Sequence, residues 1–483
     1  MELTPDYSGL TFRTFPFSVL TVLEIFSIQG RFFSFFVFNK KNAEFTHMNR
    51  HLHRHSPWLW IPALFVAEEI PLVLVSYLSL LVFYQLGLEY YSCTLLSAGL
   101  MLPWILKSFV RLKIRCIGGY RRNLFVAEFL IFLALTGVAV SLGGQPGQVS
   151  LVFFTCLLVS TLCAWHSSLS RMYYECVLRP REQRVYATTK RLSSQLSIII
   201  TYGVLIMLVG FLEVFFRSFS RAWSMANYLL GGGMLFLLVM NVLFMPGSPV
   251  SAASRPNPVS WSRALWSELC LIQRIGHQPH CLRVLSVLFM LLLPFSLLFY
   301  PRVFFLLGME ENGGLGCSLQ DVGFAQGTIG VTAFMLGESL GRYFMQHTTL
   351  RRLYIPFTLS LTIPPAFYLL MSLFPKIGNM YALCIMTGMT QFCFGLGLNI
   401  CRPFVRYVSS ERHRGAATLI YLPLVVGETI IPMAVSGACV SWLGFRGYFV
   451  VLFFVVVSAQ IYSAVNRRRV MEAFLQVQSG VPS

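Results

Sequence analysis

Charged side chains are scarce in this sequence. Asp, Glu, Lys and Arg make up 12% of its 483 residues, whereas hydrophobic residues make up 56%. The mean hydropathy is +0.67, which is higher than a water-soluble domain of this length tolerates. This composition excludes a soluble enzyme and indicates that lipid surrounds most of the chain.

Catalytic and metal-binding motifs are also missing. The sequence contains no Gly-x-Ser-x-Gly, no phosphate-binding loop and no His-Glu-x-x-His. The 12 cysteines form no Cys-x-x-Cys pair and lie mostly inside apolar runs, so we expect them to pack rather than to bind zinc or form disulfides. His51, His53 and His55 could bind a metal adventitiously, although a solvated flank explains them better. We therefore predict no catalytic residue, no metal and no cofactor.

Positive charge, by contrast, is in excess. The chain has 37 Lys and Arg against 19 Asp and Glu, which gives a net charge of +18. The basic residues are scattered between apolar runs and form no stripe with interleaved aromatic residues, which argues against a nucleic-acid partner. Contact with the surface of a lipid bilayer explains the charge better.

Long apolar runs recur along the chain. A helix needs about 20 mostly apolar residues to cross a hydrocarbon core about 30 Å thick. Six such runs precede a polar segment and six follow it, which predicts an all-α membrane protein of twelve transmembrane helices in two pseudo-symmetric six-helix bundles. The predicted spans are 58–84, 92–110, 124–142, 149–173, 192–216, 222–245, 284–307, 322–344, 353–374, 380–400, 418–440 and 448–465.

The polar segment between the two sets of runs is rich in Pro and Ser and indicates a linker. The predicted division is a first bundle at 48–246, a cytoplasmic linker at 247–282, a second bundle at 283–466 and a cytoplasmic tail at 467–483. Residues 1–47 do not fit this scheme, because their apolar stretch contains Glu24, Gln29 and Arg31. We interpret them as an interfacial or non-native extension. A thirteenth span, or translation that starts at Met48, is the alternative.

Basic residues fall almost entirely on one side of the predicted membrane. About 30 of the 37 Lys and Arg face the same side when the chain crosses twelve times. The residues assigned to the other side are Arg217, Arg221, Arg302, Lys376 and Arg446. Because basic loops resist translocation, both termini are predicted to be cytoplasmic.

Proline recurs inside the first span of each half. Pro62 and Pro71 lie in the first span, and Pro294 and Pro301 lie in the seventh. A carrier helix must bend while its freed backbone groups find partners in a wet cavity, but membrane helices tolerate proline in any case. The prolines are therefore compatible with moving helices and with ordinary ones.

The segment that joins the second and third spans of each half contains a weak internal repeat. Gly-Gly-Tyr-Arg-Arg at 118–122 is echoed by Gly-Arg-Tyr at 341–343. Glycine turns beside basic residues suit a cytoplasmic gate. Glu338 lies four residues before Arg342 on one helix face, so we predict a local pair between them. The gate candidates are Arg121, Arg122, Glu338 and Arg342.

Carboxylates inside the spans are the strongest candidates for a site. A charge at the bilayer centre costs about 2.5–3.5 kcal/mol, so a buried acid or base usually faces a cavity or a partner. Glu68 and Glu69 precede Pro71, and we expect at least one of them, preferably Glu68, to face a central cavity. Glu428 is the only carboxylate in its span. These groups could accept a proton or bind a cationic or hydroxyl-rich group, or they could only bond neighbouring helices.

Further candidates lie in the third, fourth, eighth and tenth spans. His166 and Arg171 stand five residues apart, on neighbouring helix faces, with Tyr174 close by. Arg171 could hold an anionic solute, counter a buried Glu, or merely reach the cytoplasmic surface. Polar groups that could line a cavity, but more often bond helices, are Glu128, Gln326, Gln391 and Asn399. The transport candidates are Glu68, Glu69, His166, Arg171, Tyr174, Gln391, Asn399 and Glu428.

Several short segments carry a family resemblance. They are Ser-Pro-Trp-Leu-Trp-Ile-Pro at 56–62, Ala-Glu-Glu-Ile-Pro at 67–71, Leu-Pro-Trp at 102–104, Glu-Asn-Gly-Gly-Leu-Gly at 311–316 and Gly-Thr-Ile-Gly-Val at 327–331. In these segments the chain resembles bacterial muropeptide permease-like carriers, in a branch of the major facilitator superfamily that also includes acetyl-CoA transporters. The resemblance implies a major facilitator fold, an amino-sugar or peptide solute, proton coupling and a bacterial inner membrane. The chain departs from these relatives in the fourth span, where Ser167 and Arg171 replace two acids.

We therefore predict a secondary carrier, a monomer in the bilayer, that moves a small polar or amphipathic solute by alternating access, with protons as coupling ions. The competing interpretation is a degenerate carrier that no longer transports and serves as a membrane scaffold or sensor. It predicts a collapsed cavity in which Glu68 or Glu428 neutralises Arg171.

Overall fold

The apolar runs fold into helices, because a backbone in lipid must satisfy its N–H and C=O groups within its own segment. A computed structural model describes residues 56–104, 119–144, 148–247, 279–374, 380–408 and 429–479, and the regular elements within these ranges are helical. The predictions for residues 1–47, for most of the linker and for Glu428 lie outside the described residues.

The helices of the first half run from Pro57 to Phe244. They are α2 (Pro57–Val73), the π-helical η2 (Leu74–Leu78), α3 (Ser79–Gln85), α4 (Tyr90–Gly99), α6 (Tyr120–Gly143), α7 (Val149–Val177), α8 (Pro180–Val185), α9 (Ala187–Ile198), the π-helical η3 (Ile199–Val204), α10 (Leu205–Phe216) and α11 (Phe219–Phe244). The run from α2 to α3 is continuous, and so is the run from α9 to α10, so each forms one helix of membrane-spanning length.

The helices of the second half follow from Pro279. They are α13 (Pro279–Phe299), α14 (Pro301–Leu307), η5 (Glu310–Asn312), α15 (Leu319–Val322), the π-helical η6 (Gly323–Gly330), α16 (Val331–His347), α17 (Leu350–Ser360), α18 (Ile363–Leu373), α19 (Met380–Gly397), η8 (Leu398–Ile400), α20 (Cys401–Val408) and α22 (Ile431–Ser479). Gly444 has φ 65° and ψ 172°, so α22 consists of two helices that meet at this glycine.

The helices match the predicted spans. Within the described residues, nine helices are long and apolar enough to cross a membrane. The last of them, Ile431–Phe474, contains the break at Gly444 and so covers the predicted span 448–465 together with the described part of 418–440. The predicted spans 92–110 and 322–344 hold α4 and the run from α15 to α16. The prediction of an all-α membrane protein is confirmed.

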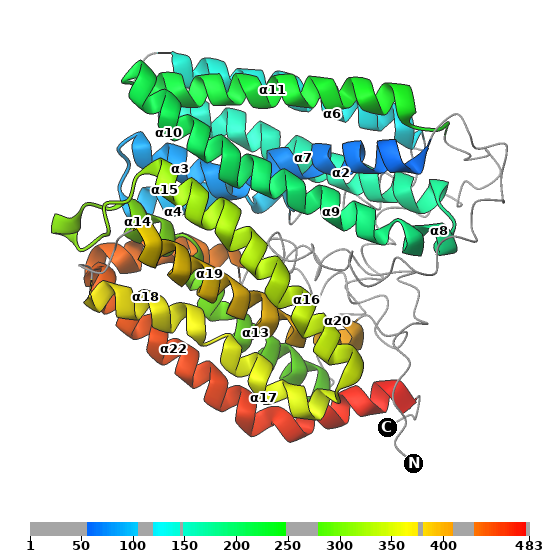
Figure 1. The fold of residues 1–483 in the computed structure, drawn as a ribbon, viewed down its shortest axis with the longest axis vertical. Coiled ribbons are helices and arrows are strands. Elements are labelled where there is room, and N and C mark those ends of the chain that lie inside the picture. Colours follow the sequence, from blue (N-terminus) through cyan, green and yellow to red (C-terminus); the bar gives the residue numbers. More distant parts are fainter. Residues whose placement is uncertain are drawn as a thin grey trace.

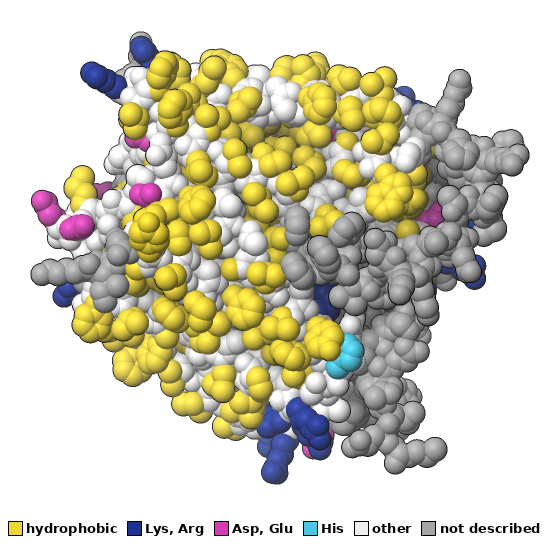
Figure 2. Space-filling model, in the orientation of Figure 1, with side chains coloured by type: hydrophobic (Ala, Val, Ile, Leu, Met, Phe, Trp, Pro, Cys, Tyr) yellow, Lys and Arg dark blue, Asp and Glu magenta, His cyan; other side chains and the backbone are white. Residues whose placement is uncertain are grey.

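The surface agrees with a lipid environment. Apolar side chains cover the face shown in Figure 2, and charged side chains gather near the ends of the helices. Phe154, Phe215, Ile385 and Phe454 are each more than half exposed. Exposed apolar surface of this extent would be unfavourable in water and is favourable in a bilayer.

The helices form two bundles that lie side by side (Figure 1). In the first bundle α6 packs against α7 and α11, and in the second α16 packs against α19 and α13 packs against α22. The two-bundle arrangement is the one that the sequence predicts.

The two bundles contact each other toward one end, which we call the closed end and which carries Gln85, Tyr90, Phe216 and Leu319. Here α4 packs on α22, α10 packs on α15, and η3 packs on η6. The Thr94 hydroxyl donates a hydrogen bond to the Ala434 carbonyl oxygen at 3.0 Å. We call the opposite end, where α2 begins and α16 ends, the basic end.

Glycine permits the close contact between the bundles. Where η3 crosses η6, a Cβ added at Gly327 would overlap the backbone of Tyr202 and Gly203. Where α4 meets α22, a Cβ added at Gly437 would overlap the Tyr90 carbonyl. Small residues let helix backbones approach closely in membranes, and these glycines set the spacing between the bundles.

Aromatic rings fill the closed end. The ring centroid of Tyr90 lies 4.7 Å from that of Phe304, 5.8 Å from that of Phe445 and 6.0 Å from that of Tyr84. Tyr84 and Tyr90 belong to the first bundle, whereas Phe304 and Phe445 belong to the second. The rings therefore join the two bundles by packing.

Candidate functional site

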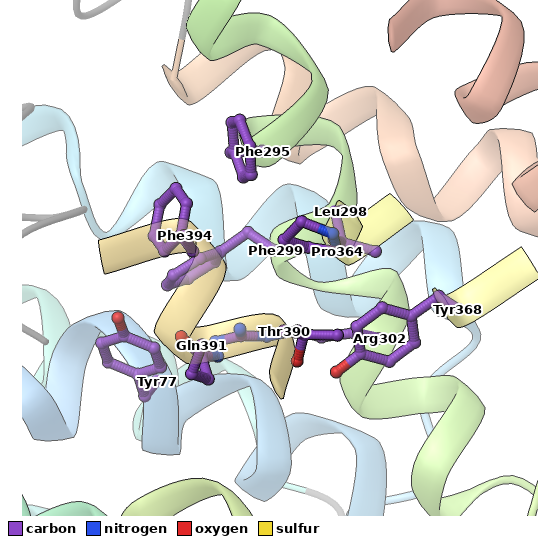
Figure 3. Close-up of a pocket in the computed structure, with 10 residues that line it drawn as sticks. All are labelled: Tyr77, Phe295, Leu298, Phe299, Arg302, Pro364, Tyr368, Thr390, Gln391 and Phe394. Atoms are coloured by element: carbon purple, nitrogen blue, oxygen red, sulfur yellow. The ribbon is translucent and has the colours of Figure 1, made fainter. Parts of the chain in front are cut away.

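A cavity lies where the second bundle faces η2 of the first (Figure 3). Its volume is about 30 Å³, or about 410 Å³ when the space in its open mouth is included. Its lining comes from η2 (Tyr77), α13 (Phe295, Leu298, Phe299), α14 (Arg302), α18 (Pro364, Tyr368) and α19 (Thr390, Gln391, Phe394). Half of the lining residues are aromatic, and the others include two neutral polar residues and one cation.

The cation on the wall is Arg302, which is only 7% exposed. Pro301 cannot continue the hydrogen-bond ladder of α13, so the chain restarts there as α14 and Arg302 enters its first turn. The guanidinium carbon lies 5.3 Å from the centroid of Phe299, and the Nε atom is buried without a hydrogen-bond partner. In the sequence Arg302 counts among the few basic residues predicted on the non-cytoplasmic side, and in the structure it lies in a buried cavity wall.

Phenol and amide groups surround Arg302. Tyr202, Tyr368 and Tyr77 lie within its electrostatic range. Gln326 donates from Nε2 to the Tyr368 hydroxyl and to Thr387 Oγ1, both at 3.2 Å. The Oε1 atom of Gln391 is buried and has no hydrogen-bond partner. The predicted cavity residue Gln391 does line this cavity. Gln326 is not in the lining, but it donates a hydrogen bond to the lining residue Tyr368.

Glu68 lies inside the first bundle, between α2 and α7. It is 5% exposed, and the Ser167 hydroxyl donates a hydrogen bond to its Oε1 atom. Its Oε2 atom is buried without a hydrogen-bond partner. The described residues that line the cavity do not include Glu68 or Glu69. Glu69 is instead within electrostatic range of Tyr77, which does line it.

His166 belongs to a buried network between helices of the first bundle. Its Nε2 atom lies 3.1 Å from Glu128 Oε1, which also accepts a hydrogen bond from Asn241 Nδ2 at 2.7 Å. Ser170 Oγ lies 3.3 Å from His166 Nδ1. The network joins α6, α7 and α11, so His166 and Glu128 bond helices together and do not line the described cavity.

Arg171 and Tyr174 lie near the basic end of α7. Arg171 is partly buried, and the Tyr174 hydroxyl donates to the Gln183 carbonyl oxygen at 3.1 Å. The Lys190 ammonium lies 4.2 Å from the centroid of Phe65 and 5.3 Å from that of Tyr174. Neither Arg171 nor Tyr174 is among the residues around the described cavity.

The predicted pair in α16 is present. Glu338 Oε1 accepts hydrogen bonds from Arg342 and also from Arg402 in α20, a partner that sequence spacing did not reveal. Asn399, predicted as a cavity group, instead donates from Nδ2 to the Glu338 carbonyl oxygen at 3.2 Å and packs on Gly341. It bonds helices of the second bundle near the predicted gate and is absent from the cavity lining.

The other two gate candidates lie at the start of α6. Arg121 donates from Nη2 to the Val242 carbonyl oxygen at 3.3 Å, and Arg122 is exposed. Their role as a gate stays a prediction.

Within the described part of the chain, no group of three His, Cys, Asp or Glu side chains is arranged to hold a metal ion.

Neither a protein-family model nor a curated protein matches the chain, but solved structures match most of its length. A bacterial homologue of the human lysosomal transporter Spinster, in an inward-facing and unoccupied conformation, matches with a TM-score of 0.58 at 12% identity over 88% of this chain and 98% of its own. The nucleoside transporter NupG gives 0.58 at 15% identity over 84% and 98%. A D-xylose-proton symporter gives 0.53 at 14% identity over 88% and 97%.

At these identities the likeness shows the fold. The chain has the fold of transporters of the major facilitator type, as predicted, and its structural neighbours are transporters rather than enzymes.

Proposed function

We propose that the chain is a secondary transporter that moves a small polar or amphipathic solute by alternating access between its two bundles. The observation that carries this proposal is the cavity where the bundles meet, whose wall holds the unpartnered atoms Arg302 Nε and Gln391 Oε1. Buried polar atoms without partners are costly, and a ligand that bonds them removes the cost. A transporter fold with such a cavity supports solute binding near the middle of the membrane.

We further propose that the structure represents the inward-facing state of this carrier. The distribution of Lys and Arg favours a cytoplasmic basic end in a bacterial inner membrane. The bundles are joined at the closed end by aromatic rings and by glycine contacts, which is the arrangement expected of an inward-facing carrier. The match to an inward-facing Spinster homologue supports the same assignment.

The solute class that we propose is an amino sugar or peptide, as the sequence resemblance implies. Aromatic walls suit the flat apolar faces of sugars, and Gln391 and Arg302 offer hydrogen bonds to hydroxyl, amide and acid groups. A non-transporting scaffold is the second candidate, because the cavity without its open mouth has a volume of only about 30 Å³, which is room for about two water molecules.

Glu68 is the proposed site of proton coupling. Its carboxyl group is buried, and its described contacts come from Ser167 and, at the backbone carbonyl oxygen, from Cys163. These described contacts include no cationic side chain, which is why we propose Glu68 rather than the arginine-bonded Glu338.

Uptake by reconstituted protein tests this function. Proteoliposomes with an imposed inward proton gradient are expected to accumulate radiolabelled N-acetylmuramyl dipeptide, and Glu68→Gln is expected to abolish the gradient-driven part. Glu89→Gln, at an exposed position just before α4, is the matched control and should behave like the wild type. Accumulation that survives in Glu68→Gln would remove Glu68 from the coupling mechanism. A wild-type protein that takes up no dipeptide would favour the scaffold.

A further inference from the structure

The cavity contains a cation whose counter-charge the described residues do not supply. The groups that influence Arg302 electrostatically are the phenols of Tyr202, Tyr368 and Tyr77, which are neutral at physiological pH. No carboxylate in the described ranges lies within 4.0 Å of an Arg302 side-chain nitrogen. An unpaired buried cation is costly, so an anion that enters the cavity would gain binding energy by pairing with it.

The donors and acceptors on the wall suit a carboxylate. A guanidinium presents planar N–H donors that match two carboxylate oxygens, and Arg302 has its Nε still unbonded. The other polar residues of the lining are Tyr77, Tyr368, Thr390 and Gln391 (Figure 3). These groups can bond further polar atoms of the same solute.

The rest of the wall suits a flat apolar group. The Phe295 and Phe394 rings are stacked with centroids 4.4 Å apart, and the Phe299 ring lies beside the guanidinium. Rings of this kind pack favourably on another ring or on the apolar face of a solute. The cavity therefore combines one anion-binding group with an aromatic surface.

We propose that an organic anion binds in this cavity and its open mouth, about 410 Å³ together, with its carboxylate on Arg302 and a flat apolar group against Phe295, Phe299 and Phe394. The proposal narrows the solute class and rests on the proposed transport function for its physiological meaning. Binding itself needs neither a gradient nor transport, so the proposal of anion binding and the proposal of transport can fail separately.

Thermal unfolding of the purified full chain in detergent tests the proposal. The probes are N-acetylphenylalanine, its neutral amide N-acetylphenylalaninamide, and acetate. The acid is expected to raise the melting temperature, because it has both the charge and the ring, whereas the amide and acetate each lack one of them. Equal shifts with acid and amide, or no shift with the acid, would overturn the proposal.

Variants of Arg302 distinguish binding of the acid at this site from binding elsewhere on the protein. Arg302→Gln is expected to weaken the affinity for the acid on the order of tenfold or more, and Arg302→Lys by less, because Lys keeps the charge without the planar fork. The control is Arg446→Gln, since Arg446 donates to the Ser372 carbonyl oxygen at 3.0 Å outside the cavity. The control should keep the wild-type response to the acid. An unchanged affinity in Arg302→Gln would contradict the proposal.

The empty protein provides a second readout. If Arg302 is unpaired, Arg302→Gln should unfold at a higher temperature than the wild type in the absence of probe, because the cost of a buried cation is removed. A lower melting temperature would mean that Arg302 stabilises the empty protein, and the premise of an uncompensated buried cation would be wrong. Acid binding without dipeptide uptake would keep this site and favour the non-transporting scaffold. Dipeptide uptake that is unchanged in Arg302→Gln would refute this site but keep transport.

Discussion

At the scale of single residues, Glu338 holds two arginines at once. Arg342 and Arg402 bond the same oxygen, and Asn399 bonds the backbone of Glu338. The three side chains come from α16, α20 and the short η8, so one carboxylate joins separate elements of the second bundle.

Glu338→Gln is therefore expected to destabilise the protein. The Glu338 and Arg342 side chains are 11% and 16% exposed, and two cations would lose their partner. Loss of hydrogen bonds to charged groups costs about 1.5–3 kcal/mol, so the melting temperature in detergent should fall by several degrees. Glu311→Gln, at an exposed position near the closed end, is the control and should not change it. A melting temperature as high as that of the wild type would show that the cluster is not stabilising.

Cys317, between α14 and α15, allows a test by pH. Burial, and then the nearby Asp321 carboxylate, raise the pKa of the Cys317 thiol to about 11. The reactive thiolate is therefore rare at neutral pH, and labelling by a maleimide should rise about tenfold per pH unit between pH 7 and 9, as followed by mass spectrometry. Asp321→Asn should raise the rate at each pH, because it removes the negative charge and keeps a capping side chain. A rate independent of pH would contradict the raised pKa.

The buried polar residues also show what sequence can reveal of a site. Spacing was enough to predict the pair of Glu338 and Arg342, because helix geometry brings residues four apart onto one face. Arg302 was missed, because a basic residue near the end of an apolar run has the same sequence pattern whether it reaches water or turns inward. Pro301 was the available signal, since it restarts the helix just before Arg302.

At the scale of elements, the positions of the helices were predictable and their irregularities were not. Hydrophobicity over a window of about 20 residues gives the spans, because the bilayer imposes that length. The π-helical segments η2, η3 and η6 have no pattern in the sequence that distinguishes them from α-helix, and η3 and η6 lie where the two bundles contact each other. Glu428, the only carboxylate in its predicted span, lies outside the described part of the chain.

The crossing of η3 and η6 gives a prediction at this scale. Gly327→Ala is expected to impair transport and lower stability, because its Cβ would overlap the backbone of Tyr202 and Gly203. Gly232→Ala in α11 is the matched control, since a Cβ there meets nothing within 4 Å and alanine favours a helix. Uptake and thermal unfolding measure both effects. Equal uptake and equal melting temperatures of the two variants would show that the crossing accommodates an added methyl group, which the structure does not indicate.

At the scale of the whole molecule, alternating access requires the two ends to change in opposite directions. Spin labels at Glu89 and Glu311 report on the closed end, and labels at Arg181 and Arg351 report on the basic end; all four positions are exposed. In bilayers, conditions that lengthen the distance between the labels at Glu89 and Glu311 are expected to shorten the distance between the labels at Arg181 and Arg351. Pulsed electron paramagnetic resonance on cysteine-free backgrounds measures both. Distances that stay fixed under proton gradient and probe would favour the non-transporting scaffold.

The glycine crossing of η3 and η6 also determines how far each end would travel. Leu319 is eight residues from Gly327 along the helix, and His347 is twenty residues away in the other direction. At 1.5 Å per residue these lengths are about 12 Å and about 30 Å. If the helix rotates as a rigid body about this crossing, its two ends move by unequal distances. A small separation of the aromatic rings at the closed end then corresponds to a displacement about two and a half times as large at the basic end.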